Sequence, residues 1–180
     1  MREYGDEGGR WAPASEAHPV AMGARPWRVT PEDAHYHPPL HSRDGRLVLV
    51  ADARLDNRAD LAARLHLTGE LRDWSDPHLI LAAYEAWGRA CPRELVGDFA
   101  FIVWDDREQA LFAARDAVGQ RVLFYRRHDR QVALATTAHA LAMLPPGPPK
   151  LNEQKVADFL VLLQRPEITF FEGIERLPPG

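Results

Sequence analysis

Short apolar runs divide this chain into predicted strands. Residues 46–53 are apolar with β-branched valines and follow the turn signal Asp44-Gly45, which predicts a buried strand that ends at Arg54. Turn residues separate four further runs, at 99–104, 110–114, 122–125 and 131–136. Runs at such short intervals predict an antiparallel meander.

Helical periodicity separates the first strand from the meander. Asn57 is placed to cap a short helix, and Ser75 to cap a longer one that has Pro77 in its first turn and ends at Gly88. The longer helix carries one apolar stripe, which consists of Ile80, Tyr84 and Trp87 with Ala83 beside them.

The two ends of the chain differ from this centre. Residues 1–25 are rich in Gly, Pro, Ala and charge without periodicity, which predicts irregular structure. A helix at 138–144 stops at the proline run 145–149, and helix resumes at Asn152. Its apolar face consists of Val156, Phe159, Leu160 and Leu163. Strands inside and helices outside indicate an α+β layered sandwich.

Bulk properties fit one domain. The 180 residues, of which 46% are hydrophobic and 27% charged, suffice for a single core. The sequence has no run near the roughly 20 apolar residues of a membrane span and no secretory signal, so the cytoplasm is the expected location. The one cysteine, Cys91, excludes a disulfide framework, and it has no histidine base among its sequence neighbours. A buried, inert thiol is therefore predicted.

The sequence argues against nucleic acid, nucleotides and metal ions as ligands of this segment. The net charge is -4 and the arginines are scattered among acidic residues, which leaves no basic stripe for nucleic acid. Neither lysine, Lys150 or Lys155, follows a glycine-rich turn, so no nucleotide or other cofactor is expected in this segment. His35, His37 and His41 form a short cluster interrupted by prolines, which is more typical of a solvated loop than of a metal site.

Several motifs stand in the order of one known family. Residues 97–105 and 111–125 resemble the glutamine amidotransferase domain of asparagine synthetases. Residues 47–57 are similar to that family's glutamine-site strand, and 170–180 to the stretch that leads into its synthetase domain. The resemblance implies one amidotransferase domain over 1–180, in which the part from 145 onward leads toward an absent C-terminal synthetase domain.

The resemblance also implies a fold and a reaction. The fold is an amino-terminal-nucleophile fold, a four-layer αββα sandwich of two antiparallel sheets between helices. In the family, glutamine is hydrolysed to glutamate and ammonia, and a second domain uses ATP to activate the carboxylate that ammonia attacks. ATP and magnesium are therefore expected only in that absent domain. The expected partners are that absent synthetase domain and glutamine. The oligomeric state is left open.

The chain departs from the family where the chemistry is most demanding. The family's nucleophile is a cysteine that becomes the first residue after methionine removal, whereas residue 2 here is Arg2. The family's Asn-Gly pair, which stabilises the oxyanion, corresponds to Asp52 and Ala53. A carboxylate there repels a developing oxyanion, and loss of one donor costs on the order of a hundredfold in rate. No catalytic residue is therefore predicted.

Four residues form the predicted, vestigial glutamine site. Asp76 matches the family's aspartate for the glutamine ammonium, Asp52 and Ala53 match the Asn-Gly pair, and Arg25 neighbours the position of the arginine for the substrate carboxylate. The residue types alone favour structural roles. Ser75-Asp76 is typical of a helix cap, and Asp52 of a strand-end carboxylate bonded to backbone. Asp56 with Asn57 is typical of a turn and cap, and Arg115 with Asp116 of a structural ion pair.

Three functions are open at this point. The leading hypothesis is an inactive, glutaminase-like domain that docks on an ATP-using domain which forms lactam or macrolactam bonds with an internal amine. The second is a fragment of a glutamine-hydrolysing asparagine synthetase that lacks its first strand. The third is an amino-acid-binding or scaffold module. Residues 166–180 are the expected docking segment, because Phe170, Phe171 and Ile174 would need a partner surface.

Overall fold

The computed structural model describes residues 9–11, 20–26, 28, 30–163 and 165–180. The chain forms two compact units, Met1–Asp116 and Ala117–Gly180. No helix among the described residues is long and apolar enough to span a bilayer.

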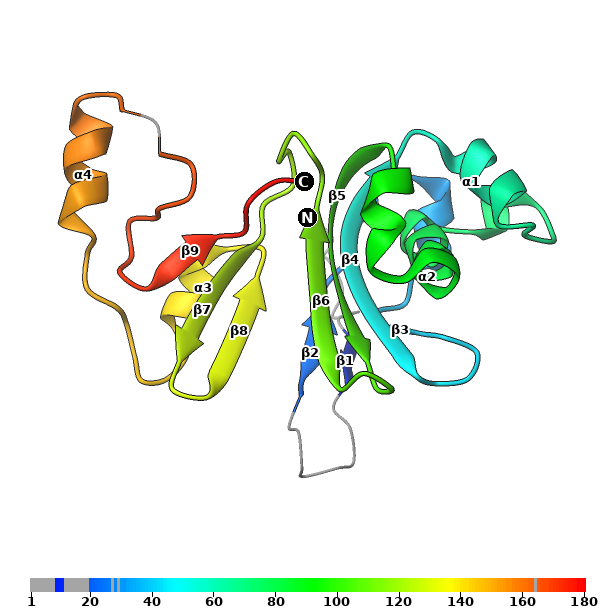
Figure 1. Ribbon diagram of the computed structural model, residues 1–180, viewed down its shortest axis with the longest axis horizontal. Coiled ribbons are helices and arrows are strands. Elements are labelled where there is room, and N and C mark those ends of the chain that lie inside the picture. The colour runs from blue at the N-terminus through cyan, green and yellow to red at the C-terminus, as the bar shows by residue number, and fades with distance from the viewer. Residues whose placement is uncertain (1–8, 12–19, 27, 29, 164) are drawn as a thin grey trace, which may run out of the picture. The chain divides into compact units, whose positions relative to one another are not determined.

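The first unit is built on a four-stranded antiparallel sheet in the order β3-β4-β5-β6 (Figure 1). Its strands are β3 (Leu40–His41), β4 (Leu47–Leu55), β5 (Gly97–Asp105) and β6 (Ala110–Arg115). The helices are α1 (Arg58–Arg64) and α2 (Asp76–Trp87), with short 3-10 segments η1 (Pro31–His35), η2 (Leu71–Asp73) and η3 (Gly88–Glu94).

The prediction of irregular structure over 1–25 is wrong for part of that segment. Strands β1 (Gly9–Trp11) and β2 (Met22–Ala24) pair antiparallel, with Trp11 opposite Met22. Their glycine content hides the strand pattern, because a three-residue strand is too short to show alternation. The rest of the prediction, at 1–8 and 12–19, lies outside the described residues.

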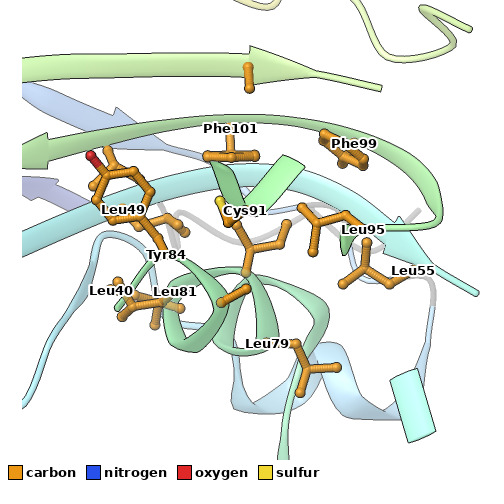
Figure 2. Packing of buried hydrophobic residues seen from close by; sticks show 14 of the residues in the cluster. Leu40, Leu49, Leu55, Leu79, Leu81, Tyr84, Cys91, Leu95, Phe99 and Phe101 are labelled. Carbon is orange, nitrogen blue, oxygen red and sulfur yellow. The ribbon is translucent and has the colours of Figure 1, made fainter. Parts of the chain in front are cut away.

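The main core lies between α2 and the sheet. Strand alternation sends Leu49 of β4 and Phe101 of β5 to the helix side, where α2 contributes its predicted stripe (Figure 2). That stripe is confirmed: Ile80, Ala83 and Tyr84 are buried, and Trp87 is partly buried. Gly88 ends the helix with a positive φ of 55°, as predicted.

Strand β4 is covered on both faces. Its Val48 and Val50 point away from α2 and pack with Trp104 of β5 and Met22 of β2. Burial on two sides explains the unbroken apolar run that predicted this strand. The strand continues one residue beyond Arg54, because β5 pairs with it as far as Leu55 opposite Gly97.

Tyr36 completes the hydrogen bonding of β4 beyond the end of its short neighbour. Strand β3 pairs only with Val48 and Leu49 of β4. The N–H of Ala51, further along β4, therefore needs another acceptor. The Ala51 N–H donates to the Tyr36 hydroxyl at 3.0 Å, and the Tyr36 side chain is buried. A side chain thus takes the place of a longer edge strand.

Tyr36→Phe is expected to lower the free energy of unfolding by about 1–2 kcal/mol, because it leaves the Ala51 N–H without its acceptor. Burial raises the pKa of Tyr36 from 10.0 to about 12. The folded state therefore holds this proton more tightly than the unfolded state, and the stabilisation is complete below pH 10 and is lost as pH rises toward 12. Urea unfolding on both sides of this window should show the difference between the two proteins shrinking at high pH. An unchanged difference would contradict the assignment.

The second unit contains a three-stranded antiparallel sheet in the order β8-β7-β9. Its elements are β7 (Phe124–His128), β8 (Gln131–Ala135), β9 (Ile174–Arg176), α3 (Ala138–Ala142) and α4 (Glu153–Leu160). Leu141 of α3 packs against Phe124 and Ile174 of the sheet. The Thr137 hydroxyl caps α3, and the Asn152 side chain caps α4.

The predicted single meander is wrong, because its four runs are divided between two sheets. Strands β5 and β6 pair in the first unit, whereas β7 pairs with β8 and β9 in the second. After Asp116, whose N–H still donates to Phe99 O at 2.8 Å, the chain leaves the sheet. Strand β7 starts at Phe124 and runs through polar residues to His128, since backbone pairing with β8 needs no apolar side chains.

Helix α4 leaves most of its predicted apolar face exposed. Its buried residue is Asp158, whose carboxylate accepts from Gln154 Nε2 at 2.9 Å and lies 3.2 Å from Arg165 Nε. Residues 159–163, here called the apolar ridge, are between 47% and 80% exposed. The predicted docking segment is also corrected, because Ile174 is buried in β9 and Phe171 packs on the same core. Of its three apolar residues only Phe170 is exposed.

Candidate functional site

Asp76 is the first residue of α2, and it is only 3% exposed. Its Oδ2 accepts a hydrogen bond from the Leu55 N–H at 2.9 Å, where β4 ends. Its Oδ1 accepts from the guanidinium of Arg58, the first residue of α1. Both carboxylate oxygens therefore have partners within the chain.

Arg58 joins three elements, its own helix α1, η2 and α2. Besides Asp76, its guanidinium donates to Leu71 O at 3.1 Å and to Trp74 O at 2.6 Å. Leu71 is the first residue of η2, and Trp74 directly follows that segment. The side chain of Arg58 is mostly buried. Sequence reasoning missed this residue, because the partner of an arginine 18 positions away is a matter of tertiary structure.

Two effects compete at the Asp76 carboxyl. Burial raises its pKa above the ordinary value, because a charged carboxylate loses its hydration. The Leu55 N–H and the Arg58 guanidinium oppose this rise, since both favour the ionised form. Burial is the larger of the two effects, and the buried carboxyl is held by two internal donors.

Asp52 and Ala53 lie on opposite faces of β4. Ala53 is half-buried against the core on the α2 side, opposite Phe99 of β5. Asp52 is exposed and shares the other face with Val50, in a row with Ala100 of β5. The bond predicted from Asp52 to backbone stays a prediction.

The structure distributes the four predicted glutamine-site residues over three elements. Arg25 is exposed and follows directly after β2. Asp52 and Ala53 come from β4, and Asp76 from the start of α2. Asp76 lies in a buried polar network that is closed by Arg58. Arg115 and Asp116, predicted as an ion pair, are both buried at the end of β6.

Two predicted caps are corrected. Ser75 occupies the N-cap position of α2, but its hydroxyl bonds His78 Nδ1 at 2.7 Å instead of a backbone N–H. The side chain of Asn57 likewise does not cap α1, because it bonds Glu94 O at 2.9 Å and Val96 N–H at 3.1 Å. It ties the start of α1 to the segment that enters β5.

The Ser75–His78 pair resembles a nucleophile beside its base, but its surroundings exclude that role. Ser75 is 0% exposed, so no substrate reaches its hydroxyl. Burial and the nearby His35 and His37 lower the pKa of His78, so its ring is neutral at pH 7. Among the residues that the structure describes, no group of three His, Cys, Asp or Glu side chains is arranged to hold a metal ion.

Cys91 is fully buried in the main core, which confirms the predicted burial of the thiol. Burial raises the pKa of Cys91 to about 12, so the thiolate is scarce even at pH 9. In native buffer we expect no measurable reaction with a thiol reagent such as DTNB at pH 7 or pH 9, and one equivalent after denaturation. Rapid labelling of the folded protein would contradict this burial.

The chain is similar to known proteins of one family. Residues 5–180 match the model of the glutamine amidotransferase domain family. The chain belongs to this family. Related proteins include Amidase chry2 of Gibberella zeae, 28% identical over 97% of this chain and 25% of the relative. Asparagine synthetase [glutamine-hydrolyzing] 3 of Bacillus subtilis is 28% identical over 73% of this chain and 22% of the relative.

This glutamine amidotransferase domain therefore spans about a quarter of the length of the curated relatives it matches. Among solved structures, the glutamine phosphoribosylpyrophosphate amidotransferase from B. subtilis, complexed with ADP and GMP, matches with a TM-score of 0.53. The match has 19% identity and covers 67% of this chain and 28% of that one. It confirms the predicted fold class, α+β with two antiparallel sheets in an amino-terminal-nucleophile fold.

Proposed function

We propose that this domain is a glutaminase-like accessory module, without glutaminase activity, of an ATP-dependent amide-forming enzyme related to asparagine synthetases. One observation carries the proposal: β4 has Asp52 at the position where the resemblance expects an asparagine. The side-chain amide of that asparagine stabilises the oxyanion. An exposed carboxylate cannot donate a hydrogen bond to the oxyanion and repels it.

The chain also offers no thiolate for the attack on glutamine. Its one cysteine is Cys91, whose sulfur is buried in the core and whose pKa is raised to about 12. Glutamine hydrolysis of this kind needs an accessible, activated thiol. Two features of these 180 residues therefore support the proposal: Asp52 in place of the side-chain oxyanion donor, and a single thiol that is buried.

Ammonia release from L-glutamine tests this proposal. We expect the chain to release ammonia no faster than a buffer control, and the double variant Asp52→Asn with Ala53→Gly to remain inactive, because it restores the donor but supplies no thiol. Glutamine-dependent ammonia release by the unaltered chain that requires a free thiol would overturn the proposal.

The partner in this proposal is an ATP- and magnesium-using synthetase domain of the same polypeptide in the cytoplasm. The apolar ridge supports it, since five consecutive exposed apolar residues exceed the scattered apolar surface of ordinary monomers. Phe170 extends the ridge, because its ring lies edge-on to Phe159 at 5.7 Å. Leu162 adopts a φ of 57°, a backbone conformation that favours glycine. A leucine at this position therefore has a conformational cost.

A hydrophobic dye tests the ridge. The chain should enhance ANS fluorescence, and Leu160→Glu combined with Leu162→Glu should remove most of the enhancement. Val118→Glu is the matched control, because Val118 is 79% exposed in the same unit but lies outside the ridge. Equal dye binding by the chain and the double variant would contradict a docking role for the ridge.

A further inference from the structure

We propose that Arg58 is the built-in occupant of a cation subsite centred on Asp76, and that it excludes the ammonium group of free amino acids from this carboxylate. The inference rests on the proposed function, in which Asp76 marks a vestigial glutamine site. It assigns the exclusion of free amino acids to one residue of α1.

The Asp76 carboxylate has little capacity left for a ligand. One oxygen accepts from the Leu55 N–H, and the other from Arg58. The Asp76 side chain is 4% exposed, so an incoming ammonium would have to replace a donor and could not be added beside it. The Leu55 donor belongs to the paired strand β4, which leaves Arg58 as the group to be displaced.

Displacement of Arg58 is unfavourable for two reasons. The guanidinium is tethered to the chain, so it competes at a high effective concentration with any free cation. It also satisfies Leu71 O and Trp74 O, and a departing arginine would leave both carbonyls and the buried carboxylate without this donor. Arg58 is therefore a fixed occupant and not a gate.

An ordinary structural ion pair and a self-occupied subsite differ in one property. A subsite keeps its preference for cations when its occupant is removed. Truncation of Arg58 should leave a cavity with an unpaired buried carboxylate and two carbonyl acceptors, which is the chemistry that binds a small guanidinium or ammonium ion.

The experiment compares Arg58→Ala with Arg64→Ala in thermal unfolding of the whole chain. Arg64 is the matched control, because it lies on the same helix and pairs with Glu94 and Asp60, but at the surface. We expect the melting temperature to fall by about 10 °C for Arg58→Ala and by no more than about 2 °C for Arg64→Ala. Millimolar ethylguanidinium should restore part of the loss for Arg58→Ala only, measured against equal sodium chloride.

Two results would overturn the inference. One is a folded Arg58→Ala protein that gains nothing from ethylguanidinium. The other is an increase in the melting temperature of the unaltered chain with L-glutamine that disappears in Asp76→Asn. Either would show that Arg58 does not occupy a cation subsite or does not exclude the amino acid.

A measurement on the unaltered chain decides the question if Arg58→Ala does not fold. In NMR spectra the guanidinium N–H signals of Arg58 should be protected from exchange and unchanged by millimolar L-glutamine. Loss of protection on addition of glutamine would contradict the inference. Ammonia release with unchanged Arg58 signals would contradict the proposed function and leave the role of Arg58 intact, so the two failures are distinguishable.

Discussion

Gly97→Ala is expected to destabilise the protein by about 3–5 kcal/mol, the sum of backbone strain and overpacking. Gly97 begins β5 with a φ of 138°, a conformation that side chains disfavour. A Cβ at this position would lie 2.2 Å from Arg54 O and 2.9 Å from Leu55 Cα. These are backbone atoms of a paired strand, so neither can move away without a loss of hydrogen bonds between β4 and β5.

Gly45→Ala is the matched control. Gly45 also has a positive φ, of 73°, but a Cβ there would meet nothing within 4 Å. Its cost should be about 1 kcal/mol, from the backbone conformation alone. Urea unfolding of both variants separates the two contributions. Equal destabilisation would mean that the close approach at Gly97 carries no energetic weight.

Phe101→Ala should cost a similar amount, about 3–5 kcal/mol, because it creates a cavity in the main core. Phe101 is 1% exposed and points from β5 toward α2 (Figure 2). Its ring centre lies 5.9 Å from that of Phe99 and 6.0 Å from that of Phe112, so truncation also removes two aromatic contacts.

Leu111→Ala provides the comparison for Phe101→Ala. Leu111 is in the adjacent strand β6, but its side chain is 39% exposed, so its truncation should cost less than about 1 kcal/mol. The two unfolding midpoints in urea should therefore be well separated. Similar midpoints would place the main core elsewhere than between α2 and the sheet.

The bond from Arg58 to Asp76 bears on whether Asp76 has a functional or a structural role. By the family resemblance, Asp76 stands at the ammonium-binding position, and that match taken alone would indicate a glutamine site. The contacts with Arg58 and the Leu55 N–H show that the carboxylate is already in use. A residue that matches a functional position can thus hold a structural partner, and only its neighbours in space distinguish the two.

Patterns of local period were the dependable part of the sequence. The run at 46–53 and the stripe of α2 predicted β4 and its covering helix, because alternation and helical period depend only on neighbouring residues. The replacement of the family's asparagine by Asp52 and the burial of the single Cys91 were also predicted, from motif and residue type. The order of the motifs was enough to predict the family that residues 5–180 match.

Contacts between distant residues were decided only by tertiary structure. The sequence did not predict that β5-β6 and β7-β8 belong to different sheets, because strand pairing depends on which edge is available in space. Nor did it predict that α4 buries Asp158 and exposes its apolar ridge, since an amphipathic pattern does not say which face is covered. The Arg58–Asp76 pair spans 18 positions, and a pairing at such a distance is selected by the packing of α1, η2 and α2 and not by local propensity.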